Sequence, residues 1–370
     1  MRAGVLSIGA LLIACGPQPV RVVSSEITAN HNDYIHDLII DGNRDANEVR
    51  QGLPVWNQPF RGFTKNNGIV INARRHVTIR NVTFRNIAGF AILVARSSDI
   101  TIDHVVVEHS GSRDAKGKNN TTGGILFEEG TTDFRVVNSE FRDIRGNAIW
   151  THSLYTSPRN ARGLIRGNRF DTIGRDAIQV GHATEVQVLD NTGTRIGYPA
   201  EIVDATPVGV DTAGNVDRSV YARNRFRDVD GKCIDLDGFH DGDVRGNECA
   251  NLTGYGIVMN NTNPDMQSSN IRVVDNVIDG AGFGGIFVIG GPNVVTGNRL
   301  LNLNRRHEGD PLLKSGIFLG DRAERPAPAN GNVIERNTIT GATICVGGST
   351  ERNTVRANQC NAGQASGPAR

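Results

Sequence analysis

The stretch DFRVVNSEFRDIRGNAIWTHS, residues 133–153, contains three short runs of alternating apolar and polar residues, separated by Asn or Gly. The same pattern recurs in HVTIRNVTFRNIAGFAILVAR at 76–96 and in GLIRGNRFDTIGRDAIQVGHA at 163–183. Alternation with a period of two is typical of β-strands, and repetition at a fixed interval is typical of repeat architectures. Each unit is therefore expected to be one turn of a stacked fold.

A recurrent Asn marks the repeat. It stands at positions 138, 168, 191, 224, 247, 276, 298, 337 and 358, and units without insertions are 21 to 23 residues long. Asn suits a corner because it tolerates a left-handed backbone and can hydrogen-bond the same group one turn away. Three short strands per turn predict an all-β chain folded as a right-handed parallel β-helix of about eleven coils between residues 36 and 360.

On these repeats, and on the opening DLIIDGNRDAN at 37–47, the chain resembles the pectate-lyase-like superfamily of right-handed β-helix proteins. The resemblance covers nearly the whole sequence. It implies a substrate site on the outer surface of one sheet. It is specific for the fold and not for the function, because the superfamily includes lyases, hydrolases, epimerases and non-catalytic proteins.

The composition limits the partners. The chain has 370 residues, a formal net charge of +1 and 5% aromatic residues. A charge this small predicts no nucleic-acid partner. No apolar run after the N-terminus is long enough for a transmembrane segment, and we expect a monomer.

The N-terminal stretch MRAGVLSIGALLIACG, residues 1–16, has one Arg and then a short apolar run. Its LIAC segment resembles the lipobox of bacterial lipoprotein signals, which predicts a signal over 1–15 and a lipid anchor at Cys15. The alternative is a truncated first strand of the fold. Residues 16–361 are then the β-helix, and 362–370 a disordered tail.

Four further cysteines stand at 233, 249, 345 and 360. An even number fits an exported protein with up to two disulfides, and no spacing suits a zinc site. We expect a secreted, periplasmic or cell-surface protein.

The strand after the second Gly-containing corner aligns across the coils, and alternate residues point into or out of the helix. The expected inner ladder is Ile92, Ile125, Ile149, Ile178, Val210, Ile234, Ile257, Ile286, Ile317 and Ile344. The expected first outer column is Leu93, Leu126, Trp150, Gln179, Asp211, Asp235, Val258, Phe287, Phe318 and Cys345. The expected second outer column is Ala95, Glu128, His152, Gly181, Ala213, Asp237, Asn260, Ile289, Gly320 and Gly347.

Titratable residues on this outer surface are confined to the middle coils, and they are densest at Asp211, Asp235 and Asp237. On adjacent strands Asp211 and Asp235 would lie about 4.8 Å apart, unless the irregular unit around Asp211 slips by one residue and turns it inward. Clustered like charges cost stability, so they indicate a metal, a shared proton or a substrate.

One interpretation is a polysaccharide lyase. The three aspartates would hold Ca²⁺ against a uronate carboxylate, and a basic side chain would remove the neighbouring proton. The candidate bases are Lys232, His152, His182 and His240. A lysine base requires a lowered pKa.

A second interpretation is a glycoside hydrolase with two aspartates as acid and base. The layout loosely resembles that of polygalacturonases, but their Asp-Asp, His-Gly and Arg-Ile-Lys signatures are absent. In either enzyme Trp150 would stack on a sugar. The other expected substrate-binding residues are Glu128, Gln179, His182, His240 and Asn260.

A third interpretation is a non-catalytic protein that binds glycan or acts as a rigid spacer. The clustering of aspartates favours an enzyme, and elimination or epimerisation over hydrolysis. Insertions are expected to wall one edge of the groove, at 111–123, 151–160, 197–208, 261–269 and 305–315, with a long loop at 43–67.

Overall fold

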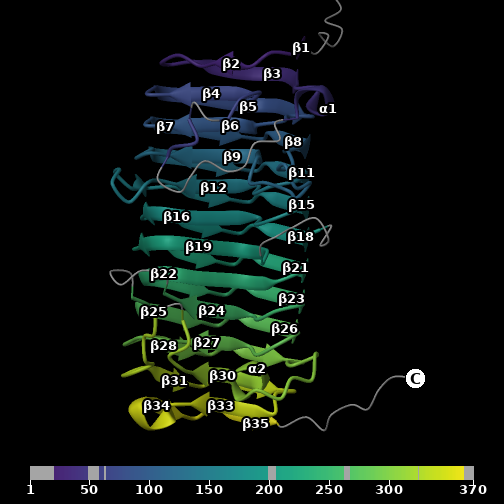
Figure 1. The fold of residues 1–370 in the computed structure, drawn as a ribbon. Helices are drawn as coiled ribbons and strands as arrows, with labels where there is room; N and C mark the ends of the chain where they lie inside the picture. The colour runs from purple at the N-terminus through teal and green to yellow at the C-terminus, as the bar shows by residue number, and fades with distance from the viewer. Residues whose placement is uncertain are drawn as a thin grey trace, which may run out of the picture.

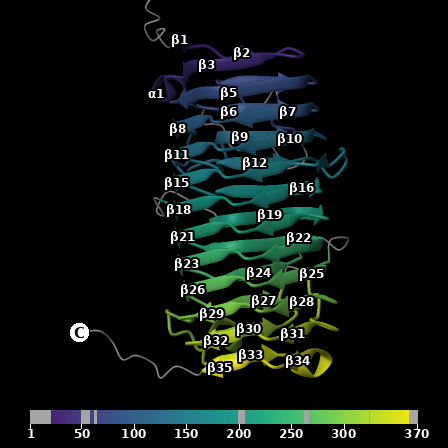
Figure 2. The ribbon, with the colours of Figure 1, turned by 180° about the vertical axis from the view of Figure 1, so that it is seen from behind.

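The computed structural model describes residues 21–48, 58–61, 64–198, 206–261, 267–323 and 325–361. The predicted signal with Cys15, and the predicted tail at 362–370, lie outside these residues. In the described part, short parallel strands are stacked in successive coils from the N-terminal to the C-terminal end (Figure 1). Figure 2 shows the same stack from behind. The predicted parallel β-helix is confirmed.

Each coil contributes a strand to three sheets, which we call faces A, B and C in chain order. Face A consists of β2 (Ile27–Thr28), β4 (Ile69–Asn72), β6 (Phe90–Ala95), β9 (Gly123–Glu128), β12 (Ile149–His152), the first part of β16 (Ile178–Thr184) and of β19 (Val208–Asp217), the start of β22 (Lys232–Arg245), β24 (Ile257–Asn260), β27 (Ile286–Val288), β30 (Ser315–Leu319) and β33 (Ile344–Gly348). The described residues therefore contain twelve coils, one more than expected, because the first begins before residue 36.

Face B follows face A around a corner. Its strands are the first part of β3 (Tyr34–Asp41) and of β5 (Arg75–Arg85), β7 (Ser98–Asp103), β10 (Thr132–Val137), β13 (Asn160–Ala161), β14 (Leu164–Arg166), β17 (Gln187–Leu189), β20 (Val220–Ala222), the end of β22, β25 (Ser269–Val274), β28 (Val294–Thr296), β31 (Val333–Glu335) and β34 (Thr354–Arg356).

Face C closes each coil. Its strands are β1 (Arg21–Val23), the second part of β3 and β5, β8 (Val106–Ser110), β11 (Glu140–Ile144), β15 (Arg169–Ile173), β18 (Thr192–Ile196), β21 (Arg225–Val229), β23 (Glu248–Leu252), β26 (Val277–Ala281), β29 (Arg299–Leu301), β32 (Thr338–Thr340) and β35 (Gln359–Asn361). Two short helices, α1 (Arg44–Asn47) and α2 (Pro311–Lys314), lie outside the sheets.

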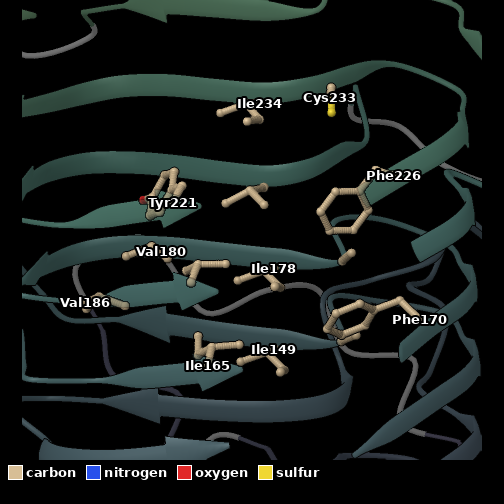
Figure 3. Close-up of a cluster of buried hydrophobic side chains, with 14 of the residues drawn as sticks. Ile149, Ile165, Phe170, Ile178, Val180, Val186, Tyr221, Phe226, Cys233 and Ile234 are labelled. Atoms are coloured by element: carbon tan, nitrogen blue, oxygen red, sulfur yellow. The ribbon is translucent and has the colours of Figure 1, made fainter. Parts of the chain in front are cut away.

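The predicted inner ladder of face A is confirmed from Ile92 to Ile317, since each member is the register partner of the next. Figure 3 shows Ile149, Ile178 and Ile234 pointing into the interior, where Phe170 and Phe226 pack from face C. The prediction for the last coil is wrong. Ile317 pairs with Val346, while Ile344 pairs with Ser315, two residues before Ile317.

A column of asparagines, buried except for the half-buried last member, forms the corner between faces B and C. The members are Asn168, Asn191, Asn224, Asn247, Asn276, Asn298, Asn337 and Asn358, and each side-chain amide donates to the next side-chain oxygen at 2.9–3.0 Å. We call this column the Asn ladder. Asn138 is not part of it. It takes the left-handed conformation, and Ser139 occupies the equivalent place and donates its backbone N–H to Asn168.

Two disulfides connect face A to face C. Cys233 on face A joins Cys249 on face C across the interior, with Cα atoms 6.0 Å apart. Cys345 joins Cys360 near the C-terminal end, with Cα atoms 5.9 Å apart. All four cysteines expected to be available for disulfides are therefore used.

Candidate functional site

Asp211 and Asp235 are register partners on β19 and β22, so the predicted pairing on face A is confirmed. Asp211 also pairs with Gln179 on β16, which places all three side chains in one outward column. The irregularity of β19 lies after Ala213, beyond Asp211, so the register does not slip at the aspartate. Asp235 is 7% exposed and Asp211 is half-buried.

A third carboxyl group, that of Asp176, completes the cluster. It lies at the corner just before β16, and its Oδ1 accepts a hydrogen bond from the backbone N–H of Val208 at 2.9 Å. Its own N–H donates to Oδ1 of Asn147 at 3.2 Å. Sequence reasoning missed Asp176, because an aspartate beside Gly174 and Arg175 matches a solvated turn.

Hydrogen bonds hold Gln179 and Asp211 in place. The Asn147 side-chain amide donates to Oε1 of Gln179 at 2.8 Å, and the Gln179 amide donates to Oδ2 of Asp211 at 2.7 Å. Asn147 is 1% exposed, so the first link is shielded from water. The chain of amides orients the Asp211 carboxyl group before any substrate arrives.

Lys232 forms an ion pair with Asp235 at the start of β22. Burial lowers the pKa of Lys232, but the carboxylates of Asp235, Asp211 and Asp237 raise it by more, so its net pKa is above the ordinary value. The ammonium form is therefore favoured. This is opposite to the lowered pKa that a lysine base requires.

The aspartates differ in their protonation. Burial, partly offset by Arg175, raises the pKa of Asp176 to about 7. Burial and the charges of Asp176 and Asp235 raise the pKa of Asp211 well above its ordinary value. Near neutral pH this group of carboxyls therefore retains a proton, while the Lys232 ammonium lies against Asp235. Oδ1 of Asp235 has no hydrogen-bond partner among the described residues.

The residues expected to bind Ca²⁺ do not fit that ion. Lys232 contacts Asp235, and the Gln179 amide donates to Asp211, so donor groups stand where a cation would bind. Asp237 is half-buried and pairs with Asn260 on β24. In the described ranges, the residues whose ligand atoms all lie within 4.8 Å of one another are Glu128, Glu129 and His152, in another part of face A.

Comparison with known proteins places this geometry in a family. The family model for the right handed beta helix region matches residues 60–216, 123–300 and 209–368. The chain belongs to this family. No curated protein matches the sequence of this β-helix.

Several solved structures share the fold of this β-helix protein. The surface protein and adhesin PfbA of Streptococcus pneumoniae is 17% identical over 76% of this chain and 87% of its own, with a TM-score of 0.60. The periplasmic alginate epimerase AlgG is 14% identical over 91% of this chain and 77% of its own, with a TM-score of 0.59. The GH136 lacto-N-biosidase of Eubacterium ramulus is 13% identical over 92% of this chain and 59% of its own, with a TM-score of 0.57.

The N-terminal part of face A in this β-helix is covered, so the prediction that Trp150 is an open stacking platform is wrong. Trp150 is 7% exposed and packs edge-on against Phe60, with ring centroids 4.9 Å apart. The Glu128 carboxylate accepts the backbone N–H groups of Phe60 at 2.8 Å and Arg61 at 2.5 Å. Burial raises the pKa of Glu128 to about 7. His152 packs beside Trp150, and burial lowers its pKa.

The other two histidines expected in the site, His182 and His240, make their contacts in the described residues with groups outside the aspartate cluster. His182 is buried in an irregular part of β16, packs edge-on against Tyr155 at 4.8 Å, and has a pKa lowered to about 4 by burial. His240 hydrogen-bonds Asp241 at 2.9 Å and Asn215 at 3.2 Å, near the corner with face B.

The insertions of this β-helix are expected from the sequence to line one edge of face A, and this prediction is wrong. The insertions enter and leave face A at both of its edges. Those within 111–123, 197–208 and 305–315 connect face C to face A, whereas those within 151–160 and 261–269 connect face A to face B. In the described residues no helix is long and apolar enough to cross a membrane.

Proposed function

We propose that the protein is a carbohydrate-active enzyme that hydrolyses glycosidic bonds on face A. The observation that carries the proposal is the cluster of Asp176, Asp211 and Asp235. Burial raises the pKa of Asp176 and of Asp211, which favours their protonated forms, while Lys232 forms an ion pair with Asp235. Glycoside hydrolysis requires one protonated and one ionised carboxyl group on either side of the bond.

Each residue has a distinct role in this mechanism. Asp211, positioned by Gln179, donates its proton to the glycosidic oxygen as the bond between that oxygen and the anomeric carbon breaks. Asp235, whose Oδ1 lacks a partner among the described residues, stabilises the positive charge on the sugar and delivers or activates the incoming oxygen nucleophile. Asp176 shares the proton of the cluster, and the Lys232 ammonium forms an ion pair with Asp235.

Elimination or epimerisation at a uronate is the second candidate, and the lowered pKa values of His152 and His182 favour it, because neutral imidazoles can act as bases. The raised pKa of Lys232 disfavours lysine as that base. Polysaccharides are also the ligand class that a non-catalytic β-helix surface protein would bind.

We further propose that the protein works outside the cytoplasm. Two disulfides support this location, because they persist in oxidising compartments. A lipid anchor at Cys15 remains a proposal, and labelling of intact cells with palmitate would test it.

The test is a turnover assay on a panel of pectate, alginate, other acidic glycans and neutral oligosaccharides. We expect new reducing ends without ultraviolet absorbance of unsaturated products. Asp211→Asn and Asp235→Asn should each lower kcat by about 100-fold or more. Asp243→Asn, on the face B part of the same strand, is the matched control and should leave kcat unchanged.

The other outcomes separate the alternatives. Absorbance that depends on a histidine would establish elimination, and inversion of the sugar C5 seen by nuclear magnetic resonance would establish epimerisation. Binding of a glycan with no turnover in any assay would contradict the enzymatic proposal.

A further inference from the structure

A short segment at residues 58–61 closes face A on its N-terminal side. Phe60 is 4% exposed and packs against Trp150 and Phe90, with ring centroids at 4.9 and 5.9 Å. Its backbone, and that of Arg61, is held by the two oxygens of Glu128. The segment is therefore fixed through both its side chain and its main chain.

The apolar cluster beneath this segment fills the outer surface of three successive strands. Leu93 on β6, Leu126 on β9 and Trp150 on β12 are all buried against Phe60. A glycan lying along the outside of the coils would need this surface. We call Phe60 and the residues it covers the wall.

The wall stands close to the aspartates. The order of strands is β12 with Trp150, β16 with Gln179 and β19 with Asp211. Neighbouring strands are about 4.8 Å apart, so about 10 Å separates the strand of Trp150 from that of Asp211. A length of about 10 Å accommodates roughly one sugar ring. Between Trp150 and Asp211, the outward column of face A contains one side chain, that of Gln179.

We propose that face A recognises the end of a glycan chain, with the terminal sugar held between the wall and the Asp211–Asp235 pair. The inference rests on the proposed function and narrows it to cleavage that releases a short product from a chain end. The Gln179 amide, fixed by Asn147, offers polar contacts to the terminal sugar. Phe60 and Trp150 exclude a further sugar by occupying its place.

The first experiment measures binding and needs no change to the wall. The Asp211→Asn protein is titrated with oligogalacturonates, oligomannuronates and neutral oligosaccharides that carry a bulky fluorophore at the reducing end or at the opposite end. We expect one of the two labelled forms to bind and the other to bind at least tenfold more weakly. A bulky fluorophore fits only on the end of the glycan that projects out of the site. Equal binding of both forms would overturn chain-end recognition and leave the proposed function intact.

The second experiment measures products. On a polymer that the wild type cleaves, we expect a single short product at the first turnovers and little loss of viscosity per bond broken. Phe60→Ala should shift the products toward a ladder of lengths, and Tyr34→Ala, an exposed aromatic on face B, should not. A ladder from the wild type would overturn the inference. Absence of binding and of turnover across the whole panel would instead contradict the proposed function, and the inference with it.

Discussion

The Asn ladder and the Asp211–Asp235 pair are both made by stacking one residue type on successive coils, but the neighbours meet differently. In the ladder, Asn247 donates to Asn276 at 2.9 Å, and the pattern continues from coil to coil. An amide carries both a donor and an acceptor, so every member of such a stack is satisfied. An ionised carboxylate only accepts, so two of them in register require a proton or a cation.

This difference shows how one repeat supports both stability and chemistry. Face A supplies the missing positive charge with the Lys232 ammonium and with protons retained by Asp176 and Asp211. A substrate or its developing charge can replace those partners, whereas nothing can replace a partner in the buried ladder. We therefore expect substitutions in the two stacks to have opposite effects on stability.

The largest effect on stability is expected for Asn247→Ala. Oδ1 of Asn247 accepts two hydrogen bonds from Asn224, and its amide donates to the Tyr221 carbonyl and to Asn276, all within the buried ladder. Loss of these bonds should lower the free energy of unfolding by about 4 kcal/mol, measured by denaturant titration. Asn358→Ala, at the last and partly exposed member, is the control. An equal loss in both variants would contradict a role for burial.

Removing either disulfide should lower the stability of the protein by a similar amount, but only one of the two removals should lower its activity. They span 16 and 15 residues, so replacing either pair by alanine should cost about 3 kcal/mol. Only the Cys233→Ala, Cys249→Ala protein should lose activity, because Cys233 adjoins Lys232. The Cys345→Ala, Cys360→Ala protein is the control, and an equal fall of kcat in both would refute the link to the site.

The aspartate cluster should make stability depend on pH. The raised pKa of Asp176, about 7, means that the folded protein keeps a proton that the unfolded chain loses near pH 4. Stability should therefore decrease as pH rises from about 4 to 7. Asp176→Asn should flatten this part of the profile and stabilise the protein above pH 7. An unchanged slope in the variant would refute the assignment to Asp176.

The smallest effect on the free energy of unfolding is expected for a substitution of Glu128. Its pKa of about 7 predicts that the folded state holds a proton between pH 4.5 and 7, so its contribution to stability is lost as pH rises through that window. The fluorescence of Trp150, which lies under Phe60, should follow this titration. Glu128→Gln should abolish the transition near pH 7 and change the unfolding free energy by about 1 kcal/mol. A transition that persists in this variant would assign it to another group.

Much of the fold follows from local pattern. Alternation and the repeated Asn predict the strands, the inner isoleucine ladder and the pairing of Asp211 with Asp235, because stacking in register leaves each coil little freedom. The register of the last coil is mispredicted, since Val346 and not Ile344 lies opposite Ile317. Counting residues does not reveal such a change when the strand sequences are alike.

The candidate site is less predictable. Asp176 reaches the cluster from a corner, and its role depends on a hydrogen bond from Val208 in the next coil. The burial of Trp150 depends on a contact with Phe60, which stands 90 residues earlier in the chain. Both are contacts between segments that share no pattern, so no periodicity indicates them. The raised pKa of Lys232 likewise depends on how closely Asp235, Asp211 and Asp237 approach its ammonium group, which the sequence pattern does not give.

The position of the insertions at corners has a consequence for evolution. Loops between β8 and β9, or between β12 and β13, can lengthen or shorten without moving any strand. Duplication of a whole coil would extend the stack by about 4.8 Å and leave Asp211 and Asp235 facing each other. A deletion of one residue inside β19 would instead turn Asp211 inward. Descendants of this chain can therefore diverge in the glycans they accept while inheriting one unchanged catalytic pair.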